Sequence, residues 1–238
     1  MSPDERAWLT GIVEGEGTFV RAGRPGGQIR VVMTDQDVIQ RLQIVTGLGL
    51  VHNRGRRSAQ YKIAWEWAVT RRENVCTLAK ELAPLLLRRR RESLQFIFDA
   101  AGRMLPPAEE LPTRSPESWA WAAGLIEGEG WIGPGPRAVR KSSIVAVEST
   151  DHDVIERLAA ATGFGHVTSV DQRASDWKPG WRWSVHSQAD VYAVLSAILP
   201  LLGNRRAGRA HYALNWIAER AGFEPTRVLP LLLSGQAP

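Results

Sequence analysis

The chain has 238 residues and a formal net charge of +5, with a pI near 9.9, and this basic balance favours a polyanionic partner. A hydrophobic fraction of 44% argues against disorder, and the single cysteine excludes an internal disulfide and fits a reducing cytoplasm. The sequence has no run of about 18 or more apolar residues and starts with the acidic MSPDERAW, so we expect a cytoplasmic protein with neither a membrane span nor a signal peptide.

The first predicted elements are a helix and a strand pair. The helix covers residues 4–16 and runs into the stretch WLTGIVEGEGTFV. The strands TFVRAG and GQIRVVMT follow, around the turn sequence Arg-Pro-Gly-Gly. Thr34 is then predicted to cap a second helix, whose first turn carries Asp35 and Asp37, as helix caps and the helix dipole prefer.

A second strand pair, LGLVHNR and AQYKIAWEWAV, comes next. In YKIAWEWAV every second residue is apolar, which predicts a strand with one buried face. We interpret its tryptophans as core beneath a sheet rather than as a base-stacking platform. Two helices, ENVCTLAKELAPLL and RRRRESLQFIFDAAG, complete the order α-β-β-α-β-β-α-α.

The chain then repeats itself. WLTGIVEGEGTFV at 8–20 returns as WAAGLIEGEGWIG at 121–133, and MTDQDVIQRL at 33–42 returns as STDHDVIERL at 149–158. Three later matches have the same spacing along the chain as the pair MTDQDVIQRL and STDHDVIERL. They are Thr46-Gly47 with Thr162-Gly163, WEWAV with WRWSV, and Pro84-Leu85-Leu86 with Pro200-Leu201-Leu202.

The repeat predicts an α+β fold of two tandem, pseudo-twofold-related αββαββα(α) halves. Each half is expected to have a four-stranded antiparallel saddle-like sheet. The predicted halves cover residues 1–102 and 117–238, and the Pro-rich stretch RMLPPAEELPTRSP at 103–116 is interpreted as their linker.

Four glycines in the repeated helices predict a helix–helix contact. Gly11 and Gly15 share one helix face, and Gly124 and Gly128 repeat the pair. Glycine inside a helix costs about 0.5–1 kcal/mol relative to alanine, so a compensating contact is needed. Close backbone approach supplies one, and we predict that the two motif helices pack against each other.

Such packing would bring Glu16 and Glu129 together at the helix ends. Two carboxylates about 5 Å apart repel by about 3 kcal/mol at an effective dielectric near 20, and the helix dipoles add to the cost. The same arrangement suits hard divalent cations, which bind carboxylate and carbonyl oxygens. Paired metals of this kind promote phosphodiester hydrolysis.

The sheet face away from the helices is predicted to be basic. A solvated antiparallel face is the alternative explanation, but two basic sheets related by pseudo-twofold symmetry match the symmetry of duplex DNA. We predict DNA contacts for Arg21, Arg30, Arg54, Arg56, Arg57, Lys62, Arg137, Arg140, Arg173, Lys178 and Arg182.

The stretches LTGIVEGEG at 9–17 and AAGLIEGEG at 122–130 resemble the motif of the LAGLIDADG homing endonucleases in their single-chain, two-motif form. The resemblance covers nearly the whole chain. It implies a monomeric, site-specific endonuclease of intron-homing type, with prokaryotic or phage origin favoured and an organelle as the alternative. Its partner would be double-stranded DNA with a long pseudo-palindromic target, with one active site for each strand.

The resemblance also implies the metal ligands. These are the carboxylates of Glu16 and Glu129, helped by the carbonyls of Gly15 and Gly128. The implied cofactor is Mg²⁺, with Mn²⁺ able to substitute and Ca²⁺ able to bind without supporting cleavage.

Further site residues are implied by their position. Arg89 and Arg205 match a basic residue, often lysine in the family, that reaches the pocket near the scissile phosphate. A neighbouring arginine of the run 88–91 could substitute, and a solvated or phosphate-positioning face is the alternative for that run. Asp35 and Asp151 match a polar residue that orders water, although helix capping explains them equally well.

Glu14 and Glu127 occupy the motif's first acidic position, which is structural in the family. Helix periodicity points them away from Glu16 and Glu129. Two other functions remain open: a non-cleaving nucleic-acid binder, such as an RNA maturase or transcription regulator, and a structural protein. Retention of both EGEG sequences favours the enzyme, because buried like charges persist where function requires them.

Overall fold

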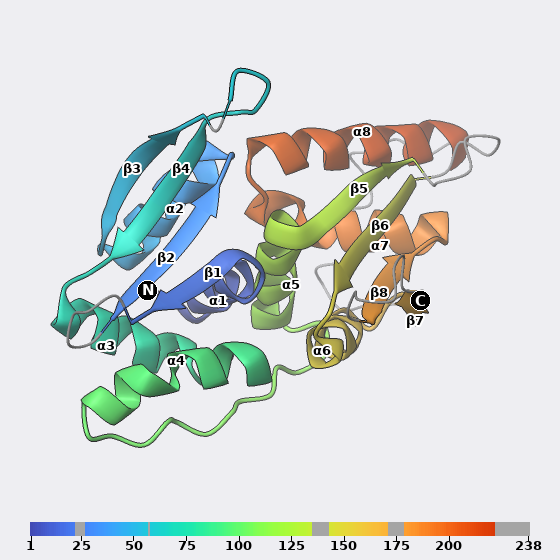
Figure 1. Ribbon diagram of the computed structural model, residues 1–238. Helices are drawn as coiled ribbons and strands as arrows, with labels where there is room; N and C mark the ends of the chain where they lie inside the picture. Colours follow the sequence, from blue (N-terminus) through green and yellow to red (C-terminus); the bar gives the residue numbers. More distant parts are fainter. Residues whose placement is uncertain (22–26, 57, 135–142, 171–178, 222–238) are drawn as a thin grey trace. The chain divides into compact units, whose positions relative to one another are not determined.

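The computed structural model describes residues 1–238 except 22–26, 57, 135–142, 171–178 and 222–238. Its contacts define two compact units, Met1–Gly128 and Glu129–Pro238. Each unit contains one four-stranded antiparallel sheet, with the orders β1-β2-β4-β3 and β5-β6-β8-β7 (Figure 1). The predicted α+β repeat is confirmed.

The elements follow the same order in both copies. The first copy consists of α1 (Pro3–Glu16), β1 (Gly17–Val20), β2 (Gln28–Met33), α2 (Gln36–Thr46), β3 (Leu50–Gly55), β4 (Ala64–Val69), α3 (Arg72–Leu82) and α4 (Arg88–Ala100). The second consists of α5 (Pro116–Glu129), β5 (Gly130–Pro134), β6 (Ser143–Ser149), α6 (His152–Thr162), β7 (His166–Val170), β8 (Gly180–Val185), α7 (Gln188–Ile198), a 3-10 turn (Leu199–Leu201) and α8 (Asn204–Ala221).

The second tryptophan of β4 and of β8 is part of the core. Trp67 of β4 is fully buried, and its indole nitrogen donates to the Leu48 carbonyl at 2.9 Å. Trp183 of β8 does the same with Phe164 at 2.7 Å. The glycine after each acceptor has a positive φ and lies against the indole, where a side chain would not fit. These tryptophans therefore anchor the loop before the third strand of each copy.

Two local predictions were wrong. Asp35, not Thr34, is the N-cap of α2, because the Asp35 carbonyl accepts the first helical hydrogen bond, from the Ile39 amide.

Strand β4 begins at Ala64, so Lys62 precedes it and lies in an exposed loop. The ladder stops there because β3 is irregular at its end, where Gly55 has a φ of 74°.

The motif helices α1 and α5 pack against each other, as predicted. A Cβ placed on Gly11 would lie 2.1 Å from the Trp121 carbonyl oxygen, and one on Gly124 would lie 2.1 Å from that of Trp8. Because a real side chain cannot approach a backbone oxygen so closely, only glycine allows this separation. A Cβ on Gly128 would lie 3.1 Å from Glu16 Cγ, so the approach continues toward the helix ends.

The packing of α1 against α5 explains where the compact units divide. The second copy of the repeat starts near residue 117, but α5 up to Gly128 belongs by contact to the first unit. The linker is also attached to this unit: Glu109 forms a 2.9 Å ion pair with Arg6, and its amide donates to the Pro84 carbonyl at 2.7 Å. The boundaries 1–102, 103–116 and 117–238 stay a prediction about the repeat.

Within the described residues, no helix combines the length and the apolar character that crossing a membrane requires.

The glycine contact predicts a large difference between two helical substitutions. Gly11→Ala forces a methyl group onto the Trp121 backbone, so we expect the free energy of unfolding to fall by about 3 kcal/mol. Gly208→Ala in α8 is the matched control, because a Cβ there meets nothing within 4 Å. We expect the control to gain roughly 0.5–1 kcal/mol. Urea denaturation measures both, and equal midpoints would contradict the close approach.

Candidate metal and nucleic-acid sites

Each motif helix ends in a glutamate followed directly by a strand. Glu16 is the last residue of α1 and is half-buried, and β1 begins at Gly17. Glu129 is the last residue of α5 and is exposed, and β5 begins at Gly130. The carbonyls of a last helical turn lack intrahelical partners and carry the negative end of the dipole. Both helix ends therefore offer oxygen ligands only.

The other glutamate of each motif is buried. Glu14 is 2% exposed, and its carboxylate accepts from the Leu87 amide at 2.9 Å, where α4 begins. Glu127 is fully buried and acts on Arg41 of α2: burial lowers the pKa of the Arg41 guanidinium, and the Glu127 charge opposes that effect. Glu14 thus fastens α1 to the start of α4, and the charge of Glu127 acts on α2.

Two arginines contact the motif ends: Arg90, which was predicted only as a member of the run 88–91, and Arg206, which was not predicted for the site. Arg90 donates from Nε to the Glu14 carbonyl at 2.8 Å and from Nη2 to the Gly15 carbonyl at 2.5 Å. Arg206, its repeat equivalent, is 5% exposed and donates to the Gly130 carbonyl. The repeat offset narrows the run to two candidates, because it aligns Arg90 with Arg206 as well as Arg89 with Arg205, but it does not distinguish between the two pairs.

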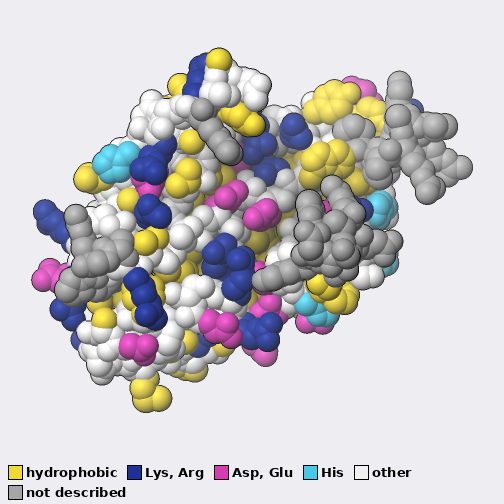
Figure 2. All heavy atoms as spheres, viewed as in Figure 1, with side chains coloured by type: hydrophobic (Ala, Val, Ile, Leu, Met, Phe, Trp, Pro, Cys, Tyr) yellow, Lys and Arg dark blue, Asp and Glu magenta, His cyan; other side chains and the backbone are white. Residues whose placement is uncertain are grey.

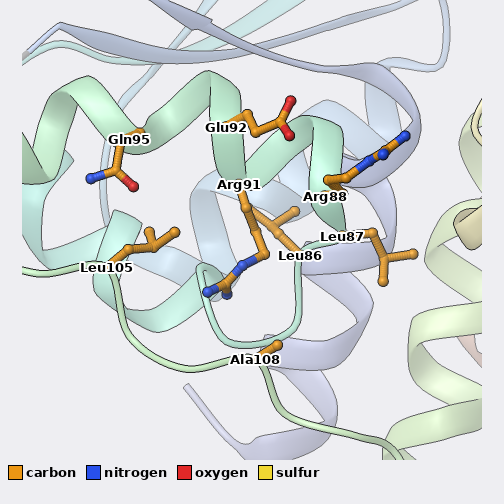
Figure 3. A pocket seen from close by; sticks show the side chains of 8 residues that line it. All are labelled: Leu86, Leu87, Arg88, Arg91, Glu92, Gln95, Leu105 and Ala108. Atoms are coloured by element: carbon orange, nitrogen blue, oxygen red, sulfur yellow. The ribbon is translucent and has the colours of Figure 1, made fainter.

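The four arginines at 88–91 have different environments. Arg88 and Arg89 are exposed, whereas Arg90 faces the motif. Arg91 donates to the Ala83 and Pro106 carbonyls, and burial lowers the pKa of its guanidinium. Figure 3 shows Arg91 pointing into the hollow between α4 and the linker, while Arg88 points away from it. Only part of the run is therefore oriented toward solvent.

Arg89 and Arg205 occupy repeat-equivalent positions in the first turns of α4 and α8. Arg89 is exposed and Arg205 is half-buried. Their proximity to a phosphate stays a prediction.

Asp35 and Asp151 are the N-cap residues of α2 and α6. Neither side chain makes a capping hydrogen bond. Asp35 is nevertheless buried, with 8% exposure. The capping explanation therefore accounts for the position of these carboxylates in the chain but not for where their oxygens point, and their role in ordering water stays a prediction.

The oxygen donors fit magnesium better than a metal that needs a protein cage. No group of three or more His, Cys, Asp and Glu side chains among the described residues is placed to hold a metal ion. Mg²⁺ needs only one or two carboxylates, because water and substrate phosphates complete its coordination. The Gly15 carbonyl already accepts from Arg90 but keeps a second lone pair. The position of Glu129 relative to Glu16 stays a prediction.

The open face of the first sheet carries a carboxylate between two arginines. Glu66 of β4 lies 3.5 Å from Arg30 of β2 and 3.3 Å from Arg54 of β3. Figure 2 shows basic and histidine side chains over the β3–β4 part of this unit, with an acidic side chain visible between them. Arg56 and Lys62, also predicted to contact DNA, are exposed in the loop between these strands.

The open face of the second sheet also carries an ion pair. Arg182 of β8 is the direct cross-strand neighbour of Glu148 of β6 and donates to its carboxylate from Nε at 2.7 Å. Trp131 of β5 is 39% exposed.

The remaining predicted DNA contacts have two outcomes. Arg21 follows β1, and its guanidinium lies over the Phe96 ring of α4, 5.1 Å from the ring centroid. It is therefore held against a helix rather than presented from the middle of the strand. Five residues lie outside the described part of the chain: Arg57, Arg137, Arg140, Arg173 and Lys178.

Known structures share this fold over the entire chain. It resembles LAGLIDADG meganuclease I-AabMI bound to uncleaved DNA, with a TM-score of 0.62, 15% identity and 100% of each chain covered. It also resembles meganuclease I-SmaMI bound to uncleaveable DNA, with a TM-score of 0.60, 13% identity and 99% of each chain covered. For I-GzeII in complex with its DNA target the TM-score is 0.57 at 11% identity, over 100% of this chain and 98% of that one.

The chain thus has the two-domain fold of LAGLIDADG homing endonucleases. Residues 3–83 match the family model described as LAGLIDADG-like domain, which confirms the resemblance inferred from the two motifs. A comparison with curated proteins found no match.

Adjacent arginines on α4 are expected to respond differently to the same substitution. Arg90→Met removes both donors to the motif carbonyls, so the free energy of unfolding should fall by about 2–3 kcal/mol. Arg89→Met changes an exposed side chain, and stability should stay within about 0.5 kcal/mol. Chemical denaturation distinguishes the two, and equal losses would contradict the assignment of Arg90 as the contact.

Proposed function

We propose that this protein is a site-specific endonuclease of double-stranded DNA that depends on Mg²⁺ and cuts one strand with each motif. The single observation that carries the proposal is the repeated helix end: a glutamate is the last residue of the motif helix in both copies, at Glu16 and at Glu129. A carboxylate in that position has an energetic cost at the dipole's negative end. Its occurrence in both copies supports a function that requires it.

In this proposal the chain's own groups divide the reaction among them. Glu16 and Glu129 hold the metal, which would activate the attacking water and stabilise the leaving oxygen when bound. Arg89 and Arg205 stabilise charge on the scissile phosphate, and Asp35 and Asp151 order water. Arg90 and Arg206 keep the adjacent carbonyls in place, because each guanidinium is hydrogen-bonded to the motif end.

Solved structures of the same fold support DNA as the substrate. I-SmaMI has been solved bound to cleaved DNA, and to an uncleaved target in the presence of calcium ions. By analogy we propose that this chain acts as a monomer, lays each sheet in the major groove of one half-site, and binds DNA without cutting it when Ca²⁺ replaces Mg²⁺.

The proposal predicts the result of replacing each acid with its amide. Glu16→Gln and Glu129→Gln remove a metal ligand but little volume, so Mg²⁺-dependent cleavage should fall by about 10³-fold or more. Binding to the same DNA with Ca²⁺ should remain. The measurement is cleavage of a plasmid that carries a site selected from random duplex DNA.

Glu73→Gln is the matched control, since it makes the same change of charge at an exposed position in the first turn of α3. Full cleavage by either motif variant would contradict the metal assignment. If the wild-type protein binds the selected DNA but cuts it with neither Mg²⁺ nor Mn²⁺, the protein is instead a non-cleaving binder such as a maturase or regulator.

A further inference from the structure

The ion pairs of Glu66 hold two arginines on the first sheet in an unusual arrangement. The Glu66 side chain is 6% exposed, whereas those of Arg30 and Arg54 are 32% and 56% exposed. The carboxylate is therefore nearly inaccessible, whereas the two arginine side chains paired with it remain partly accessible to solvent, with Nε of Arg30 buried. Its direct cross-strand neighbours on the same face are Val32 and His52.

Strand geometry explains why one carboxylate reaches both arginines. Arg30 pairs in register with Ala68, so it is a diagonal neighbour of Glu66 across β2 and β4. On the other side, the register shifts between Asn53 and Gly55, which leaves Arg54 as an extra residue in β3. A bulge of this kind re-aims a side chain.

Stability gives little reason for this cluster. Ion pairs with a half-exposed arginine contribute about 0–1 kcal/mol, and the buried carboxylate has a desolvation cost. Phosphate binding gives no reason either, because a carboxylate between two arginines reduces their attraction for a polyanion. Base recognition does benefit: an arginine fixed by a carboxylate keeps fewer rotamers and presents a planar fork in one orientation.

We propose that Glu66 is a positioning residue that orients Arg30 and Arg54 to read guanines. A guanidinium matches the O6 and N7 acceptors of guanine in the major groove and is the commonest base-specific contact. The half-site read by the β1-β2-β4-β3 sheet therefore carries guanines opposite these two side chains. This inference rests on the proposed function, because it concerns the target of the same protein.

The second sheet provides a comparison within the same molecule. There the carboxylate is on β6 and the arginine on β8, with Arg182 as the single partner of Glu148 among the described ion pairs. The same chemistry thus predicts one oriented arginine on the second sheet and two on the first. A substitution at Glu66 should change the preferences of one half-site only.

The test is selection of bound sequences from a random duplex library in Ca²⁺, with wild-type protein and Glu66→Gln. We expect wild-type protein to select guanines at the positions that Arg30 and Arg54 read. In Glu66→Gln this preference should fall by about tenfold or more in one half-site, as for loss of a bidentate contact. Affinity for unrelated DNA should stay equal or rise, because a negative charge is removed.

Two further comparisons make the outcome specific. Glu73→Gln changes the charge equally away from the sheet and should leave every preference intact. Arg30→Lys and Arg54→Lys keep the charge but lose the planar fork, and each should weaken guanine selection at one position. Circular dichroism verifies that each variant folds.

An unchanged guanine preference in Glu66→Gln would overturn the inference. It would also be overturned if the lysine variants lost no discrimination, which would make both arginines phosphate contacts. If wild-type protein selects no sequence at all, the proposed function fails as well, so the two failures are distinguishable.

Discussion

The approach of two helix backbones is the constraint on which the rest of this structure depends. Gly11 and Gly124 face each other so closely that each would place a side chain against the other helix's backbone oxygen. Removing two side chains sacrifices helix propensity and apolar contact, yet it brings the axes to a separation that no other residue permits. In α1, this contact positions the residues that follow Gly11, including Glu16 and the start of β1.

The end of α1 is also held by hydrogen bonds to the start of α4. The Glu14 carboxylate accepts from the amide that starts α4, and Arg90 of α4 donates back to the carbonyls of the same turn. This reciprocal pair joins a helix C-terminus to a helix N-terminus with favourable charge at both. A loop could not hold a carboxylate and a carbonyl in fixed positions so well, because its backbone would keep more conformational freedom.

The sequence was sufficient for the repeat, the order of elements and the inward orientation of the first glutamate of each motif. It did not identify Arg90, because four consecutive arginines carry no information about which of them, at about 100° per residue, turns toward the motif. Nor did it reveal the cluster at Glu66. Alternation placed this residue on the open face, but its partners depend on strand register and on an irregularity near Gly55.

The spacing in EGEG gives its two glutamates different environments, and in the proposed function it would let one short segment serve both stability and chemistry. Residues two apart on a helix point about 200° from each other, so Glu14 is directed into the protein and Glu16 is not. The contact of Glu14 restricts the last turn of the helix, and Glu16 is held in place because it belongs to the same turn. Because the strand begins at the next residue, no flexible segment separates the acid from the sheet that is proposed to read DNA. In the proposed function, core packing would set the position of Glu16 relative to the bases, and recognition and cleavage would be coupled through the same backbone.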